Sequence, residues 1–340
     1  MLLPMTSTRR TPLVAALLAA GLIGLTACGG GAAVEKVPAS QPISGGAQLA
    51  ALWPLTGRDV EERTPDHPVV VAKVDNTASS APQVGLGQAD LITEELVEGG
   101  MTRLAVMFYE ELPPVVGPVR SMRATDIGVV KPTLGIVAAS GAAPATLARV
   151  RAAGITAFDD LTGTGYYRDP ARRQPYDLMV KVPDLVASLE EDPVVPPSYL
   201  AWGSEADFPG GSRARSLDAV FSEEHTTSWR YARGRYVDAN SFAAEGDRFD
   251  PDTLLVLRVR QGDAGYLDPA GNKVPETLFR GTGEALLLHG GELVRGTWTK
   301  RRPGGPLRLS TKAGPLTVPA GRTWIELVPT DRDGGRVTVG

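Results

Sequence analysis

The sequence predicts an α+β, mixed α/β fold: an N-terminal mixed-sheet domain with flanking helices, followed by a mostly β domain. Three observations predict it. Short β-branched apolar runs alternate with helical segments over residues 49–192. An irregular joint rich in Pro and Gly covers residues 193–218. Short strands separated by turns then fill residues 219–340.

In the first domain, buried strands are expected over residues 68–76, 104–109 and 134–139. Residues 87–98 are compatible with either a helix or a strand. A helix is expected over residues 143–153, because Pro144 stands near its start and Gly154 just past its end. A second helix is expected over residues 182–191.

In the second domain, residues 228–237 predict a hairpin with Gly234 in its turn. Further strands are expected over residues 254–259, 283–289, 292–299 and 323–328. The aromatic side chains of this part are expected in its core, the alternative being a stacking surface for sugars or peptides; they are Trp229, Tyr231, Tyr236, Trp298 and Trp324.

The first 27 residues have the features of an export signal. Arg9 and Arg10 precede an apolar run from Leu13 to Leu25, which is too short to span a bilayer. The run ends in the sequence LTAC, which resembles the lipobox of bacterial lipoproteins. The resemblance implies cleavage before Cys28, diacylglyceryl transfer to its sulfur, and usually a further acyl group on the new amine. The chain is therefore expected on the outer face of the cytoplasmic membrane.

Residues 28–48 are rich in Gly, Ala, Pro and Ser and predict a flexible tether. The 35 Lys and Arg residues fall to 33 without Arg9 and Arg10, and against 39 Asp and Glu they give a processed chain of net charge −6. This acidic balance argues against nucleic-acid binding. Because the chain has one cysteine, it cannot form an internal disulfide. One cysteine and three histidines also argue against a metal site, and no cofactor is expected.

Polar side chains at the predicted strand ends suggest one ligand pocket. Glu94 and Glu98 would share a helix face, and Arg120 with Arg123 could clamp a carboxylate or phosphate. The alternative is a buried ion-pair network, and Lys73 is expected at a sheet edge. The full set of candidate ligand-binding residues is Asp75, Asn76, Glu94, Glu98, Arg103, Arg120, Ser121 and Arg123.

No known catalytic signature occurs in the sequence, so whether the protein is an enzyme stays open. There is no G-x-S-x-G, H-E-x-x-H, P-loop or dinucleotide fingerprint. His289, followed by two glycines, is expected to be a residue at the end of a hairpin rather than a ligand.

Several uncommon strings resemble those of the YerB-like lipoproteins, a two-domain family of uncharacterised function. They are PLTG (54–57), KVDN (73–76), LVEGGMTRLAVMF (96–108), GPVRSMRATD (117–126), YYRD (166–169), GTGEALLLHGGELVRGTWTK (281–300) and AGRTWIELVP (320–329). The resemblance implies a lipid-anchored extracytoplasmic protein whose polar motif residues map onto the eight candidates. One departure is Pro175-Tyr176-Asp177, where a Pro-His-Asn type of segment is expected.

The leading functional hypothesis is an envelope protein that binds a polar ligand, such as a cell-wall fragment, or a partner protein. The first alternative is a hydrolase of cell-wall glycan or phosphodiester that uses paired carboxylates, for which Asp75, Glu94 and Glu98 are the candidates. The second alternative is an envelope scaffold.

Overall fold

The computed structural model describes residues 51–61, 65–190 and 193–340. The export signal, Cys28 and the whole of the predicted tether lie outside the described residues. Residues from Leu49 onward form one compact unit. Within the described residues, no helix has the length and apolar character needed to cross a membrane.

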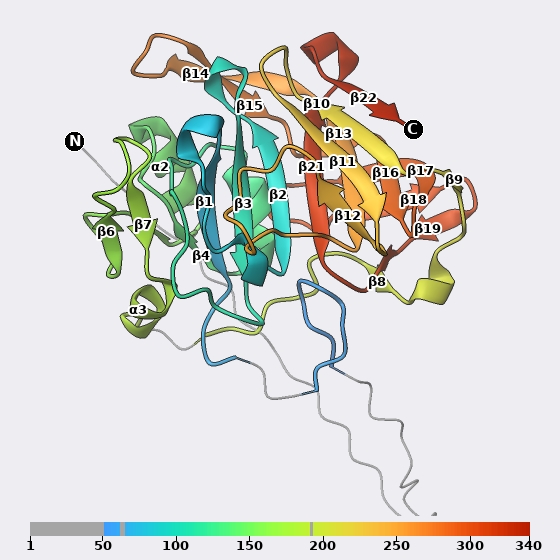
Figure 1. Ribbon diagram of the computed structural model, residues 1–340, viewed down its shortest axis with the longest axis horizontal. Coiled ribbons are helices and arrows are strands. Elements are labelled where there is room, and N and C mark those ends of the chain that lie inside the picture. Colours follow the sequence, from blue (N-terminus) through green and yellow to red (C-terminus); the bar gives the residue numbers. More distant parts are fainter. Residues whose placement is uncertain (1–50, 62–64, 191–192) are drawn as a thin grey trace, which may run out of the picture. The chain divides into compact units, whose positions relative to one another are not determined.

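One 12-stranded sheet forms the centre of the structure (Figure 1). It confirms the predicted mixed α/β class with a mostly β C-terminal part. Its strand order is β19 (Gly314–Leu316), β18 (Arg308–Thr311), β17 (Glu292–Lys300), β16 (Gly281–His289), β13 (Thr253–Val259), β21 (Thr323–Pro329), β2 (Leu91–Leu96), β3 (Thr102–Phe108), β1 (Val70–Asn76), β4 (Ile136–Ala138) and β5 (Ala157–Phe158), with β9 (Ser212–Arg213) beside β17.

The N-terminal and C-terminal parts of the chain meet within this sheet. The two parts join where β2 pairs in parallel with β21, with Leu91 opposite Thr323 and Glu95 opposite Leu327. The expected joint at residues 193–218 carries β8 (Trp202–Gly203), η5 (Glu205–Asp207) and β9. The hydrogen bonding of one sheet therefore runs across both sequence segments.

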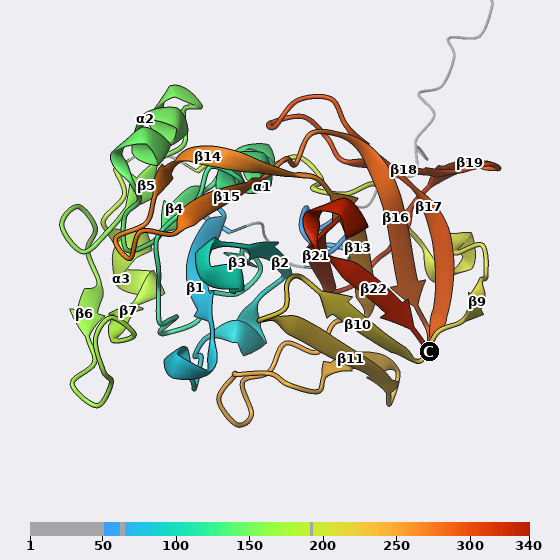
Figure 2. The same cartoon turned by 90° about the horizontal axis from the view of Figure 1, so that it is seen from above.

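A second sheet and a group of helices cover opposite faces of the main sheet (Figure 2). The small-sheet face packs against β10 (Ser216–Val220) and β11 (Thr226–Ala232) of a four-stranded sheet completed by β12 (Arg235–Asp238) and β22 (Arg336–Val339). The helix face packs against α1 (Asp126–Val130) and α2 (Pro144–Ala152).

The remaining elements are short and follow the sheet's edges. Two hairpins are β14 (Gln261–Leu267) with β15 (Lys273–Thr277) and β6 (Tyr166–Arg168) with β7 (Leu178–Val180), while β8 pairs with β20 (Val318–Pro319). The third helix is α3 (Val182–Ala187), shorter than the predicted 182–191. The 3-10 turns are η1 (Ala78–Ser80), η2 (Leu86–Gln88), η3 (Glu98–Gly100), η4 (Lys131–Thr133), η5 and η6 (Asp331–Asp333).

Strands β1, β2, β13 and β21 are among those whose carboxyl ends lie on one side of the main sheet; we call this side, which is the end of the strands and not an edge strand, the carboxyl edge. Strands β2, β21 and β13 are mutually parallel, and β1 runs with them because both β1 and β2 are antiparallel to β3. The opposite edge receives the start of the described chain, where the Thr56 carbonyl accepts a hydrogen bond from the amide of Gly321, two residues before β21. Ligands of open α/β sheets commonly bind beyond the carboxyl ends of strands, which directs attention to the first edge.

Two expectations about local structure are wrong. Residues 91–96 form a strand, so Glu94 and Glu98 do not share a helix face: Glu94 lies within β2 and Glu98 in the turn after it. Lys73 does not lie at a sheet edge, because β3 and β4 flank β1 on both sides, and its side chain is fully buried. His289 does close the β16–β17 hairpin as expected.

Candidate functional site

The eight candidate residues divide between the two faces of the main sheet. Side chains alternate along a strand, so neighbours in sequence point to opposite faces. Asn76 and Glu94 lie on the small-sheet face, where the Asn76 amide donates to Glu94 Oε1 at 2.9 Å. The other six gather at the carboxyl edge toward the helix face; we call Asp75, Glu98, Arg103, Arg120, Ser121 and Arg123 the arginine cluster.

Glu98 is the centre of the arginine cluster. Arg103 Nη2 donates to Glu98 Oε1 at 3.0 Å, and Arg123 makes a two-pronged contact with the same carboxylate, with Nε 2.8 Å from Oε2 and Nη2 on Oε1. Burial acts to raise the pKa of Glu98, but the hydrogen bonds from Arg123 and the charge of Arg103 outweigh it and lower the pKa below 4.5. Glu98 is therefore a permanently charged acceptor that orients two arginines.

Arg120 forms the more accessible part of the cluster. Its Nε lies 3.4 Å from Asp75 Oδ2, its Nη1 donates to the Pro175 carbonyl at 2.9 Å, and its guanidinium lies 5.2 Å from the ring centre of Tyr176. The Thr77 hydroxyl donates to the other Asp75 oxygen at 2.6 Å. The Arg120 side chain keeps 22% of its surface exposed, so a ligand can reach it.

Positive charge exceeds negative charge in the arginine cluster, with three guanidinium groups around two carboxylates. Arg103 is 4% exposed, and its Nε has no hydrogen-bond partner among the described residues. Burial first, and then the charge of Arg123, lowers the pKa of Arg103 to about 10. An arriving anion would offset this repulsion. Half-buried hydroxyls of Ser121 and Ser140, 3.3 Å apart, lie beside the cluster.

A second polar cluster is buried on the small-sheet face around Glu94. The Glu94 carboxylate accepts hydrogen bonds from the hydroxyls of Thr102 at 2.6 Å and Thr227 at 3.0 Å, and lies 2.9 Å from His225 Nε2. Burial acts to raise the pKa of Glu94, but hydrogen bonding, led by His225, lowers it below 4.5. Donors from both parts of the chain thus converge on one charged group.

Glu326 lies directly opposite Glu94 on the neighbouring strand. Burial, and then the charge of Glu94, raises the pKa of Glu326 well above 4.5, so this carboxyl group keeps its proton and hydrogen-bonds to Glu94. Trp229 Nε1 donates to Glu326 Oε1 at 2.6 Å. Both carboxyl groups have 0% exposure. The pair therefore links the N-terminal and C-terminal parts of the chain and does not face a cleft.

A third ionic group lies behind the arginine cluster on the helix face. Lys73 Nζ lies 2.7 Å from Glu95 Oε1 and 2.8 Å from Asp126 Oδ1, and all three side chains are essentially unexposed. Burial acts to lower the pKa of Lys73, but the two carboxylates outweigh it and raise the pKa. Burial and the charge of Asp126 raise the pKa of Glu95 to about 7. This triad fixes α1 to the sheet.

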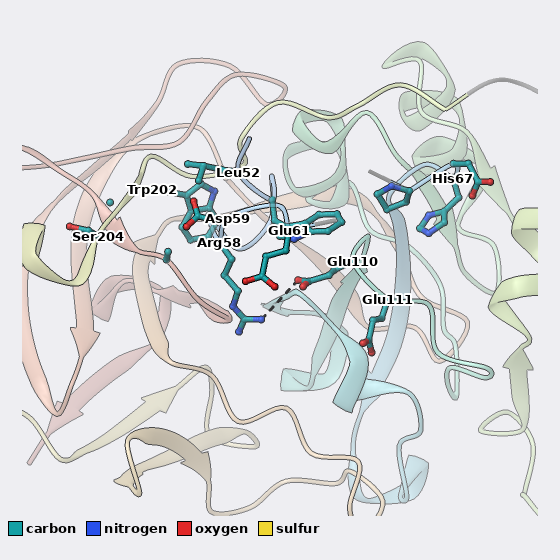
Figure 3. A pocket seen from close by; sticks show the side chains of 15 residues that line it. Leu52, Arg58, Asp59, Glu61, His67, Glu110, Glu111, Trp202 and Ser204 are labelled. Atoms are coloured by element: carbon teal, nitrogen blue, oxygen red, sulfur yellow. Dashed lines mark ion pairs between the residues drawn. The ribbon is translucent and has the colours of Figure 1, made fainter. Parts of the chain in front are cut away.

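A large acidic cleft opens at the opposite edge of the sheet (Figure 3). Its volume is about 1210 Å³. Arg58 lies 4.0 Å from Glu110, and no residue of the arginine cluster lines the cleft. Its other acidic side chains are Asp59, Glu61, Asp66 and Glu111. Among the described residues, no group of three or more His, Cys, Asp or Glu is arranged to hold a metal ion.

Sequence reasoning missed Glu95, Glu326 and His225. A charged residue within an apolar strand was the available signal for Glu95 and Glu326, in LITEEL and TWIELVP. Nothing local marks His225, which reaches Glu94 across 131 residues of sequence.

Comparison with known families defines the class of protein. The family model described as "Protein of unknown function (DUF3048) N-terminal domain" matches residues 55–195, and its C-terminal domain model matches residues 217–325. The chain belongs to this two-domain family.

A named relative and a solved structure point to the same group. The chain is 41% identical over 70 residues to "Putative lipoprotein YerB" of Bacillus subtilis (strain 168), a match that spans only 21% of each protein. The crystal structure of the YerB protein from Bacillus subtilis superposes with a TM-score of 0.70 at 20% identity, covering 85% of this chain and 99% of that one. The second likeness establishes a shared fold, and the expected YerB-like resemblance is confirmed.

Proposed function

We propose that this protein is a lipid-anchored envelope protein that binds an anionic ligand through the arginine cluster at the carboxyl edge of its sheet. The observation that carries the proposal is the surplus of one guanidinium over the carboxylates, with Arg103 buried and its Nε unpartnered among the described residues. Arginines held rigidly by other contacts recognise carboxylates and phosphates well, because their donors need no reordering on binding.

The exposed residues of the arginine cluster are the ones that a ligand would contact first. Arg120 provides the exposed guanidinium, and the Ser121 and Ser140 hydroxyls can donate further hydrogen bonds. Tyr176 stacks on Arg120 in place of the histidine expected there, so ring stacking rather than a second cation orients this arginine. The ligand class that suits this chemistry is an anionic cell-wall fragment carrying carboxylate or phosphate groups.

The anchoring part of the proposal rests on the sequence. A lipid on Cys28, which the lipobox-like LTAC sequence and the YerB likeness favour, would attach the chain to the membrane. No comparable observation favours the hydrolase, because Glu94 is fully buried and Glu98 is paired with two arginines.

Calorimetric titration of the full chain in nonionic detergent tests the proposal, with succinate and inorganic phosphate as separate probes at constant ionic strength. We expect saturable binding of at least one probe, weakened about tenfold or more by Arg120→Gln, because a charge-assisted hydrogen bond is lost. Arg151→Gln on α2, an exposed arginine, is the matched control. Equal affinities of the wild type and Arg120→Gln would refute the proposal.

A further inference from the structure

A further cleft, lined by three arginines, lies at the carboxyl edge, where the parallel strands β13 and β21 end. Its volume is about 600 Å³, and it is lined by Arg258, Arg260 and Arg332 together with Thr282 and Thr330. Arg260 follows β13 directly, and Arg332 lies in η6, the dark red turn at the top of Figure 1. Three arginines from two segments, the end of β13 and η6, therefore face one concave surface.

Three carboxylates also line this cleft, but each already has a donor. Arg295 Nη1 lies 2.8 Å from Glu284 Oε1, Arg258 Nη2 lies 2.7 Å from Asp331 Oδ1, and the Thr330 hydroxyl donates to Asp333 Oδ2 at 2.6 Å. Counting charges alone would make the cleft neutral. The difference lies in the partners: each of these carboxylates already accepts a hydrogen bond at one oxygen, whereas the Arg260 and Arg332 guanidinium groups have no partner among the described residues.

Arg258 is the fixed member of the group. Its Nη2 also donates to the carbonyls of Pro329 at 2.7 Å and Gly335 at 3.2 Å, so the guanidinium is anchored to the η6 loop. Its Nε has no hydrogen-bond partner among the described residues. The exposed side chains of Arg260 and Arg332 make no ion pair or hydrogen bond with any other described residue. One arginine is held in place by the η6 loop, and the two exposed arginines are free to contact a ligand.

We propose that this cleft is a second oxyanion site, which binds a phosphate or phosphodiester group between Arg258, Arg260 and Arg332. A tetrahedral phosphoryl group presents several acceptor oxygens and suits donors from more than one guanidinium, whereas a planar carboxylate is satisfied by one guanidinium. The inference does not depend on the arginine cluster, because β13 lies three strands from β3, about 14 Å across the sheet.

The test measures phosphate affinity of the full chain in nonionic detergent at constant ionic strength, in the wild type and in an Arg120→Gln background. We expect the double substitution Arg260→Gln and Arg332→Gln to weaken one class of phosphate binding about tenfold in both backgrounds. Both side chains are exposed and make no contacts that the fold needs, so the variant should unfold at the wild-type temperature. Arg151→Gln, again exposed, should leave the affinity unchanged.

Two probes distinguish the sources of the phosphoryl group. Tighter binding of inorganic phosphate would indicate a free phosphate ligand, and tighter binding of a bis-glycerol phosphodiester would indicate a phosphodiester polymer. Either result supports the site if the double variant no longer distinguishes the two probes in affinity. Unchanged affinity in the double variant would overturn the inference, as would an equal loss in Arg151→Gln, which would indicate general charge attraction. Because Arg120→Gln tests the first site separately, failure of one proposal leaves the other measurable.

Discussion

Glu94 and Glu326 lie opposite each other on adjacent parallel strands, one charged and one holding a proton, at the place where the N-terminal and C-terminal parts of the chain share a sheet. The charged partner collects donors from β3 and β11, and the protonated partner accepts from Trp229. Two buried carboxyl groups can lie opposite each other on neighbouring strands because only one of them ionises. Because their protonation states differ, replacing each residue with glutamine should have a different effect on stability.

Glu326→Gln should change the free energy of unfolding by less than about 1 kcal/mol, since an amide can donate to Glu94 as the protonated acid does. Glu94→Gln should cost about 3 kcal/mol, because the amide cannot accept from all the hydroxyl, amide and imidazole groups that surround it. Urea denaturation of both variants at pH 5, close to the unfolded pKa of a glutamate, measures the difference. Equal costs for the two substitutions would contradict the assigned protonation states.

The pH dependence of stability should carry the signature of Glu326. Its pKa is raised in the folded state, so its contribution to stability is fully present below the unfolded value near 4.5 and is lost as the pH rises toward the folded value. The wild type should therefore lose stability relative to Glu326→Gln between pH 5 and pH 8, by at most about 1.4 kcal/mol per pH unit. Urea denaturation at four pH values gives this difference, and a pH-independent difference would argue against the raised pKa.

Lys73→Met should destabilise the protein by about 3–5 kcal/mol, because it leaves Glu95 and Asp126 buried without a cation. Adding Glu95→Gln and Asp126→Asn should restore part of that loss, since uncharged groups cost less to bury. Thermal unfolding of the single and triple variants makes the comparison. If the triple variant is less stable than Lys73→Met, the cost comes from packing and not from the unpaired charge.

The sequence predicts the local elements of this fold better than the contacts between them. The apolar runs at β1 and β3 are sufficient to identify buried strands, and Pro144 and Gly154 bracket α2 closely. Residues 91–96 were ambiguous because Glu94 and Glu95 interrupt the apolar pattern of a buried strand. Their charge is tolerated only through partners distant in sequence, such as Lys73, His225 and Glu326.

The candidate site shows the same limit. Residue types at strand ends selected six members of the arginine cluster, because strand ends at one sheet edge meet in space. Alternation along the predicted strand 68–76 separates the faces of Asp75 and Asn76, but Glu94 could not be assigned to a face without knowing that residues 91–96 are a strand. The pairing of β2 with β21 has no local signal, since it joins residues more than 200 positions apart.

Lipid attachment at Cys28 predicts a simple outcome in cells. The wild-type chain should incorporate labelled palmitate and sediment with membranes, and Cys28→Ala should do neither, because no other thiol exists in the chain. Ser40→Ala, in the expected tether, is the control. Membrane sedimentation of Cys28→Ala at the wild-type level would rule out the lipid as the anchor.

The central claim is that the arginine cluster binds an anion, and the Nε–H resonance of Arg103 tests it most directly. In nitrogen-15 spectra of arginine side chains in the full chain, this group should shift saturably during titration with succinate or phosphate, and Arg120→Gln should weaken that shift. The Arg151 resonance reports any general effect of the added anion. An Arg103 signal that stays unchanged up to concentrations at which Arg151 shifts would contradict the account.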